Sequence, residues 1–261
     1  MAAFPSYFFA FPLNLIFLVL WVAGCALARV HCSKSPAVRF LHSPAATLIS
    51  ISVFLLLCLL IGFTGCRELA GSWIFVVSAL FLQTVLLFVI MRGWRCRSSS
   101  EGRKGKIRWR FLMLHLGLLT VIGSMFWGAP DRQTLRIKAV EGTECRDAYY
   151  MDGRLYVLKY DVLLSEFDVR EYENGTPSAY SAVAEIDGKK VSIRVNEPYS
   201  RTLCEDIYLV GFDPSLGTES SYCIFEIVRE PWKYLTVAGI VLLLAGAVLL
   251  FVRGPSESRR Q

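Results

Sequence analysis

Five apolar runs, each close to twenty residues long, constrain this chain more than any other feature of its sequence. They cover residues 11–30, 45–65, 72–91, 110–128 and 234–252. An α-helix rises about 1.5 Å per residue, so a run of about twenty apolar residues can cross the ~30 Å hydrocarbon core of a bilayer. The sequence therefore predicts a membrane protein with about five transmembrane helices.

The first of these runs is the one whose crossing the sequence leaves open, because Pro12 and Asn14 can hold its start in the interfacial layer. No Lys or Arg precedes the run, and no clean Ala-x-Ala cleavage site follows it. A removed signal peptide is therefore a poor fit, and the run is counted as a membrane helix.

Residues 129–231 have the composition of a water-soluble domain, with nineteen Asp and Glu against twelve Lys and Arg in a chain whose net charge is +6. Short β-branched and aromatic segments recur between turn signals, at 134–140, 155–164, 166–172, 181–186, 191–195, 207–212 and 222–228. Asp187-Gly188 is the clearest hairpin signal, because Gly tolerates the positive φ of a tight primed turn. The pattern predicts an all-β domain, either a sandwich or a small open barrel, inserted between the last two helices.

The Lys and Arg residues fix an orientation. They gather after the first run, after the third run and in the tail, and such basic segments stay in the cytoplasm. Five crossings then place the N-terminus and the acidic β domain outside. We expect a four-helix membrane region over 1–128, an exported β domain over 129–231, a last helix over 232–252 and a cytoplasmic tail over 253–261. Because this topology accounts for the basic residues, no nucleic-acid partner is expected.

Few residues point to chemistry. The sequence has no phosphate loop, metal-ligand cluster or nucleophile elbow, and it has three histidines. His31 and His42 fall in an inside loop, where a solvated role is expected. His115 lies within the fourth run, where an ionisable residue is costly and marks a candidate site. Neutral imidazole is a good axial ligand for haem iron, and the alternative is a hydrogen bond to a neighbouring helix or to lipid. Three nearby glycines leave room for another helix or a flat cofactor: Gly117, Gly123 and Gly128.

The eight cysteines include no Cys-x-x-Cys pair, which argues against a redox catalyst. Four of them fall on the predicted outer side, where disulfides are permitted, but the pairing is left open: Cys66, Cys145, Cys204 and Cys223. Cys204 with Cys223 is one conceivable pair. Asn174-Gly-Thr matches a glycosylation sequon. Three tryptophans at the outer ends of predicted helices are expected to be interfacial anchors: Trp73, Trp127 and Trp232.

Several short motifs occur in an order that resembles one family. They are Gly62-Phe-Thr-Gly65, Ser72-Trp-Ile-Phe, His115-Leu-Gly, Asn196-Glu-Pro, Asp206-Ile-Tyr and Glu230-Pro-Trp. With the predicted topology, they make the chain resemble the ResB-like proteins of cytochrome c biogenesis over about residues 45–252. Glu197 and Leu209 stand where such proteins often have His and Gln.

The resemblance implies a membrane subunit of a cytochrome c synthase complex that helps haem translocation and delivery to exported apocytochrome c. It implies a ResC/CcsA-type membrane partner, and a thioredoxin-like thiol reductant as a further one. His115 matches a membrane histidine that, with one from the partner, ligates haem iron. The chain is not expected to catalyse haem attachment alone. The implied location is the inner (cytoplasmic) membrane, with the β domain in the periplasm.

An alternative hypothesis is a non-enzymatic membrane scaffold whose outer β domain binds another exported protein, without haem. The lack of a catalytic constellation in the sequence favours this alternative. A transporter fits less well, because the five runs contain Gln83 and His115 but no Asp or Glu.

Overall fold

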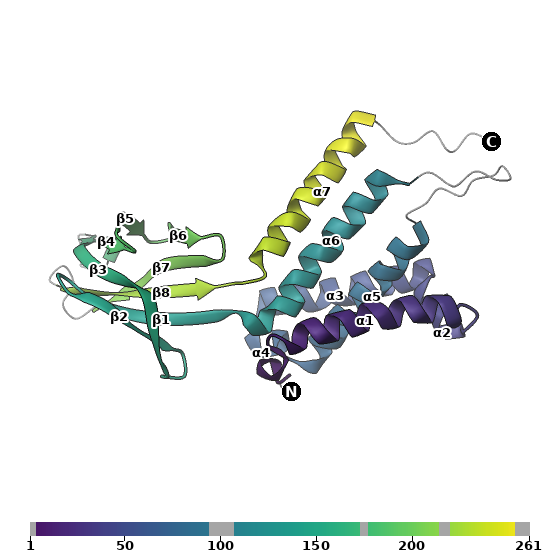
Figure 1. Ribbon diagram of the computed structural model, residues 1–261, viewed down its shortest axis with the longest axis horizontal. Coiled ribbons are helices and arrows are strands. Elements are labelled where there is room, and N and C mark those ends of the chain that lie inside the picture. Colours follow the sequence, from purple (N-terminus) through teal and green to yellow (C-terminus); the bar gives the residue numbers. More distant parts are fainter. Residues whose placement is uncertain (1–3, 94–106, 173–176, 214–219, 254–261) are drawn as a thin grey trace. The chain divides into compact units, whose positions relative to one another are not determined.

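The structure is a computed structural model that describes residues 4–93, 107–172, 177–213 and 220–253 (Figure 1). The chain divides into two compact units. The helical unit comprises Met1–Pro130 and Trp232–Gln261, and the β domain comprises Asp131–Pro231. Three sequence features fall outside the described residues: the basic segment at 94–106, the sequon at Asn174 and the end of the tail from residue 254.

Five long helices form the helical unit: α1 (Leu13–His31), α3 (Pro44–Thr64), α5 (Trp73–Gly93), α6 (Trp109–Gly128) and α7 (Lys233–Arg253). Short elements connect them: η1 (Ser6–Phe9), α2 (Pro36–Leu41), α4 (Arg67–Ala70) and η2 (Ala129–Asp131). Within the described part of the chain, five helices are long and apolar enough to cross a membrane, the first run among them. The predicted membrane protein with five spans is confirmed.

The ends of α3 show how local sequence sets these helices. Ser43 caps the N-terminus by accepting a hydrogen bond from the backbone N–H of Ala46 at 3.1 Å, and Pro44 occupies the first turn. Pro is well suited there, because its missing N–H would have no partner in the helix. Gly65 ends the helix in the left-handed region with φ 64°.

Helices α6 and α7 pack closely because glycines line their contact. A Cβ at Gly117 would lie 2.8 Å from the backbone oxygen of Gly239, and one at Gly128 would lie 2.5 Å from the Cβ of Trp232. Small residues let two membrane helices approach in this way. The sequence predicts that these glycines make room for either another helix or a flat cofactor; Gly117 makes room for α7, and Gly128 for Trp232, the residue just before α7.

The β domain is a single antiparallel sheet of eight strands in the order β5-β4-β3-β2-β1-β8-β7-β6. The strands are β1 (Gln133–Val140), β2 (Glu144–Tyr150), β3 (Leu155–Glu171), β4 (Pro177–Ile186), β5 (Lys189–Arg194), β6 (Tyr199–Thr202), β7 (Glu205–Phe212) and β8 (Tyr222–Arg229). Pairing of β1 with β8 joins the first strand to the last.

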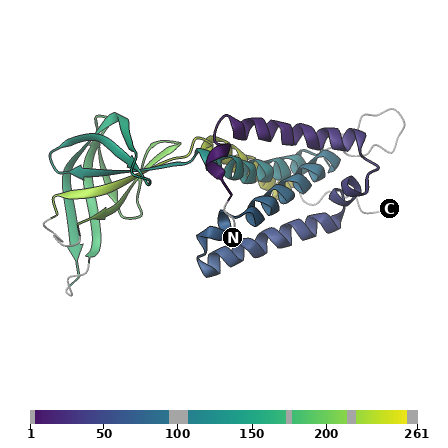
Figure 2. The ribbon, with the colours of Figure 1, turned by 90° about the horizontal axis from the view of Figure 1, so that it is seen from below.

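The sheet curls around one core, as Figure 2 shows. Its two edges, β5 and β6, follow each other in the chain and are joined by a turn in which Asn196 has φ 63°. Buried side chains from seven of the eight strands meet in this core, with Leu135, Ile193 and Phe225 among the fully enclosed ones. The predicted all-β domain between the last two helices is confirmed, and its single curled sheet corresponds to the open-barrel form of that prediction.

Several strand predictions need correction. The segments 155–164 and 166–172 form one strand, β3, with a register shift between Leu164 and Glu166 that marks a bulge. Strand β2 was not predicted, because Ala148 is its one buried residue and no apolar alternation is visible. The hairpin at Asp187-Gly188 is confirmed, with φ values of 55° and 72° between β4 and β5.

Candidate functional site

His115, the residue predicted to bind haem iron, is half-buried in the first half of α6. Its Nδ1 lies 2.8 Å from the backbone oxygen of Phe111, one helical turn earlier. A carbonyl oxygen can only accept, so Nδ1 carries the proton and donates it to this bond. In the neutral ring this bond selects the tautomer in which Nε2 carries the lone pair, which is the form that ligates a metal.

An aromatic ring holds the imidazole in place. The rings of Phe111 and His115 stack with centroids 4.0 Å apart and an angle of 28° between their planes. The end of α5 closes over Phe111, since a Cβ at Gly93 would lie 2.4 Å from its ring. The guanidinium of Arg108 lies 5.1 Å from the centroid of the same ring. The rotamer and tautomer of His115 are therefore set by its neighbours.

His115 stands apart from other potential metal ligands. The described residues contain no group of three His, Cys, Asp or Glu side chains placed to hold a metal ion. The site therefore consists of a single imidazole and not of a metal-ligand cluster.

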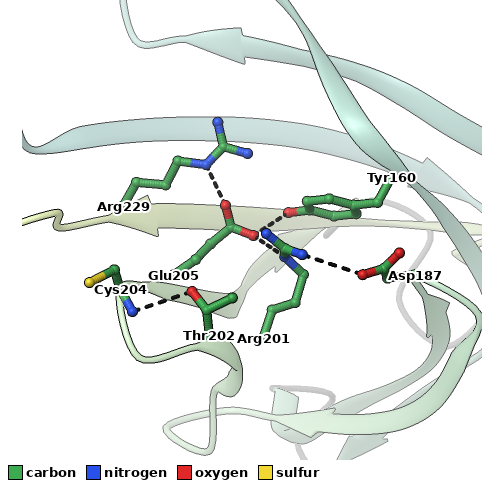
Figure 3. A network of polar contacts seen from close by, with 7 residues as sticks. All are labelled: Tyr160, Asp187, Arg201, Thr202, Cys204, Glu205 and Arg229. Carbon is green, nitrogen blue, oxygen red and sulfur yellow. Dashed lines mark hydrogen bonds and ion pairs between the residues drawn. The ribbon is translucent and has the colours of Figure 1, made fainter.

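The β domain contains a second polar site, a charged cluster around Glu205 that Figure 3 shows. The Glu205 residue is 4% exposed, and its carboxylate accepts hydrogen bonds from Tyr160 Oη at 2.8 Å, from Arg201 Nε at 2.5 Å and from Arg229 Nε. Arg201 also pairs with Asp187 at 3.3 Å. Donors from three strands thus converge on the Glu205 carboxylate, which lies on a fourth, and Asp187 joins the cluster through Arg201.

The cluster sets the ionisation of its members. Burial by itself raises the pKa of Glu205, but hydrogen bonds from Arg201, Arg229 and Tyr160 outweigh it and leave the pKa below its ordinary value. Burial and the neighbouring Glu205 carboxylate raise the pKa of Tyr160. The cluster therefore holds an ionised carboxylate between two guanidinium groups beside a neutral phenol.

A cavity of about 340 Å³ opens beside this cluster, with Tyr156 and Lys159 also in its wall. The Glu205 carboxylate accepts three hydrogen bonds, and these keep its pKa below the ordinary value, which makes it a weak base. Its arginines tie β6 and β8 to β7, where Glu205 begins the strand. The geometry supports a structural role in holding this part of the barrel together.

The sequence analysis did not predict the Glu205 cluster, although the inward and outward alternation of side chains along β8 indicates it. Phe225 and Ile227 are fully buried, and Arg229 follows them at the same spacing of two on β8. Successive side chains of a strand point to opposite faces, so Arg229 had to share the inward face. An arginine in such a position requires a buried partner.

The conceivable disulfide between Cys204 and Cys223 is excluded. Cys223 pairs with Phe212 at the start of β8, whereas the backbone oxygen of Cys204 accepts a hydrogen bond from Glu230, just beyond the end of that strand. Seven residues of strand separate these points, roughly 23 Å at about 3.3 Å per residue. Burial raises the pKa of the Cys223 thiol to about 12, so it is an inert core residue. Cys66, Cys145, Cys204 and Cys223 are all free thiols in the structure.

The tryptophans divide between two roles. Trp73 is 47% exposed at the start of α5, as expected of an interfacial anchor. Trp127 instead donates its indole N–H to Oε1 of Gln83 at 3.1 Å, within the helical unit. Trp127 and Trp232 both line a cavity there. Trp127 therefore takes part in a polar contact between α5 and α6 that the interfacial prediction did not include.

Comparisons with known proteins bear on this arrangement. A solved structure described as Cytochrome c Heme Lyase CcmF aligns with 90% of this chain and 45% of its own length, at 13% identity and a TM-score of 0.39. The chain thus spans less than half of that protein, and a TM-score of this size does not establish a shared fold. A search of curated proteins found no match. The family model of the ResB-like family matches residues 85–223, more than half of the sequence. The chain therefore belongs to the ResB-like family.

Proposed function

We propose that this chain is a membrane subunit of a cytochrome c synthase complex and helps haem reach exported apocytochrome c. Membership of the ResB-like family supports a role in cytochrome c biogenesis. The observation that carries the haem proposal is His115, an imidazole within a membrane helix whose Nδ1 is bonded to the Phe111 carbonyl. That bond leaves Nε2 as the nitrogen that would hold the haem iron.

The proposed orientation places His115 toward the cytoplasmic end of α6. The basic segment 94–106 directly precedes the helix, and such segments remain inside. The β domain, which lies between α6 and α7 in the chain, would then be periplasmic, with the N-terminus outside and the C-terminus inside. Haem would enter near His115 from the inner side, and apocytochrome c would be met on the outer side.

A partner is part of the proposal, because His115 supplies a single axial ligand. A ResC/CcsA-type membrane protein would supply the second imidazole and the site of haem attachment. Haem attachment requires reduced thiols on the apocytochrome, so a thioredoxin-like reductant is a further proposed partner. The chain would act as an accessory subunit and would not form the thioether bonds itself. Haem, when bound, would supply the iron that His115 coordinates.

The test is to purify the complex with its ResC/CcsA-type partner and measure the Soret absorbance for each mole of protein. His115→Gly is expected to lose at least half of the bound haem. Free imidazole added to the buffer is expected to restore much of it, because the substitution opens a space of the same shape. Rescue separates loss of a ligand from loss of the fold.

His31→Ala is the matched control, because His31 ends α1 as an exposed residue. Its haem content should equal that of the wild type. A normal Soret band in His115→Gly would refute His115 as a ligand. Reporter fusions that place the β domain in the cytoplasm would refute the proposed route of haem.

One observation favours the alternative function, a haem-free scaffold that binds an exported protein. Apolar side chains are exposed on the β2–β3 hairpin, where Tyr149 pairs with Leu155, and both are close to half exposed. Met151 and Val157 extend this surface at 63% and 58% exposure. Exposed apolar patches often mark protein contacts. Deletion of the gene without any loss of c-type cytochromes would favour this function over haem delivery.

A further inference from the structure

The β2–β3 hairpin exposes four apolar side chains: Tyr149, Met151, Leu155 and Val157. Tyr149 pairs with Leu155, and Val157 lies two residues farther along β3, so these three share one face of the hairpin. Met151 begins the loop that joins the two strands. An antiparallel sheet with one face on a core usually carries polar side chains on its other face, so this apolar surface is a candidate contact site. We call it the hairpin patch.

The polarity of this face changes along the hairpin. On β3, side chains at a spacing of two run from Leu155 and Val157, near the loop, to Lys159 and Asp161, farther from it. On β2 the residue opposite Val157 is already charged, since it is Asp147. A change from apolar to charged over a few residues matches the change in polarity from the acyl boundary of a bilayer to the water outside it.

Strand register places the hairpin patch near the start of β1. Tyr149 lies opposite Arg136, three residues after β1 begins at Gln133. Residues 129–132 alone join Gln133 to the end of α6. Five residue steps of at most about 3.6 Å bring the start of β1 within about 18 Å of that helix end. Because α6 is long and apolar enough to cross a membrane, its end lies close to a bilayer surface.

A second turn exposes an apolar side chain at the same end of the sheet. Gln133 pairs with Arg229, the last residue of β8, and Arg229 pairs with Glu205, the first residue of β7. Leu203, which is 42% exposed, lies in the turn just before Glu205. Residues 230–232 alone join Arg229 to α7. Exposed apolar side chains thus occur on two separate turns near the two connections to the membrane helices.

The loop of the hairpin also suits a lipid headgroup layer. Asp152 accepts hydrogen bonds from the backbone N–H of Arg154 at 3.1 Å and from its Nε at 2.7 Å, so the acidic charge of the loop is compensated. The Arg154 side chain is 74% exposed, and its guanidinium lies 5.0 Å from the centroid of the Tyr150 ring. Arginine binds phosphate while its stem stays among apolar groups, and tyrosine is enriched at membrane interfaces.

We propose that the hairpin patch inserts into the interfacial layer of the bilayer leaflet on the side of the β domain, with Arg154 at the lipid phosphates. An exported protein is the competing occupant of the same side chains. The change in polarity along the hairpin and the short connections to α6 and α7 favour lipid. Such a contact would restrain the rotation of the β domain on these two connections. It does not depend on haem, on His115 or on which side of the membrane is outside.

The test uses the full chain in liposomes of phosphatidylcholine and phosphatidylglycerol, with the photoreactive amino acid p-benzoylphenylalanine in place of Met151. Irradiation is expected to add the mass of one phospholipid to the chain. The same replacement at Phe251, 85% exposed on α7, is the positive control. Glu185 is the negative control, because it is exposed on β4 opposite Leu163, eight residues or roughly 26 Å along β3 from Leu155.

A second substitution tests whether the apolar side chains are responsible. Leu155→Asp, added to the chain with the photoreactive residue at position 151, is expected to lower the lipid adduct about fivefold, because the exposed half of the Leu155 side chain no longer gains from leaving water. Ser192→Asp adds the same charge at an exposed position of β5 and should leave the adduct unchanged. Circular dichroism verifies that both variants retain their strands.

Lipid adducts at position 151 but not at position 185, reduced by Leu155→Asp alone, would support the proposal. Reaction at position 251 without reaction at position 151 would overturn the lipid contact. Irradiation of whole cells that joins position 151 to another protein, and not to lipid, would assign the hairpin patch to a protein partner and would also overturn it. Equal lipid adducts with and without Leu155→Asp would show that the apolar patch does not cause the contact.

Discussion

The helical unit and the β domain stabilise their buried polar groups in opposite ways. Buried polar side chains in the helical unit are neutral, and Ser50, Ser78 and Ser124 each donate to a carbonyl three residues earlier in the same helix. The β domain instead buries an ionised carboxylate, Glu205, with two arginines and a tyrosine around it. The difference follows from the surroundings, because hydrocarbon offers no water to a charge that loses its partner, whereas the arginines of the cluster remain in contact with solvent.

The largest expected loss of stability comes from removing the buried charge of the β domain. Glu205→Gln removes the negative charge and leaves Arg201 and Arg229 close together without their shared carboxylate. Breaking a buried pair from one side costs about 3–5 kcal/mol, because the remaining charges stay desolvated. The free energy of unfolding of the β domain should fall by that amount. Hydrogen exchange of β7 and β8 peptides in the full chain, followed across urea concentrations, measures it.

Asp161→Asn is the matched control for this prediction. Asp161 pairs with Arg146, but both side chains are about half exposed on the outside of the barrel. Exposed ion pairs contribute little to the free energy of unfolding, so hydrogen exchange of the β7 and β8 peptides should be nearly the same as in the wild type. A Glu205→Gln variant as mild as this control would show that the cluster does not act as a buried ion pair.

The same carboxylate predicts how stability depends on pH. The pKa of Glu205 is lower in the folded chain than its ordinary value of 4.5, so folding favours the ionised form. Its contribution is therefore complete above the ordinary value and is lost as the pH falls toward the lowered pKa. The urea midpoint of the β domain should decrease as the pH falls below 4.5, by no more than Glu205→Gln itself causes.

Comparison with Glu205→Gln isolates this carboxylate from others. Hydrogen bonds from Arg146 and from the backbone N–H of Arg154 lower the pKa values of Asp161 and Asp152, respectively, and both act in wild type and variant alike. The difference between the two pH profiles therefore reports Glu205. Parallel profiles would contradict the assigned shift.

The two units also differ in how much their sequences could reveal. Apolar length alone predicts the five helices, because the bilayer sets one dimension that each must match. The strands at 134–140 and 222–228 were visible from alternation, but β2 was not, since its contacts lie mostly on an exposed surface. The Glu205 cluster joins residues from four strands, and the contact between Gln83 and Trp127 joins two helices. Side-chain contacts between distant segments depend on strand order and helix packing, which no single segment encodes.

A smaller loss of stability is expected when the close packing of α6 against α7 is disturbed. Gly117→Val would place a Cβ 2.8 Å from the backbone of α7, at both the Gly239 oxygen and the Leu243 nitrogen. Backbone atoms cannot move aside as a flexible side chain can, so we expect a loss of about 1–3 kcal/mol. Unfolding of the full chain by SDS, followed by circular dichroism, measures this loss. Gly62→Val is the control, because nothing lies within 4 Å of a Cβ at that position, and a loss of equal size there would attribute the effect to helix propensity.

The smallest effect tests whether polar bonds or close packing hold α6 against α7. Ser124 and Thr236 share a hydrogen bond of 2.8 Å between the helices. Each hydroxyl has a single proton, so whichever residue donates this bond gives up its alternative bond to a nearby carbonyl, that of Val121 or Trp232. Interhelical bonds of this kind average about 0.6 kcal/mol in membranes, because the separated helices find other partners. A double-mutant cycle of Ser124→Ala and Thr236→Val in the SDS titration should give a coupling of that size. A coupling as large as the loss in Gly117→Val would mean that a polar bond contributes as much to helix association here as close packing does. The helical unit would then differ from the β domain only in the absence of a buried charge, and not in its use of polar contacts.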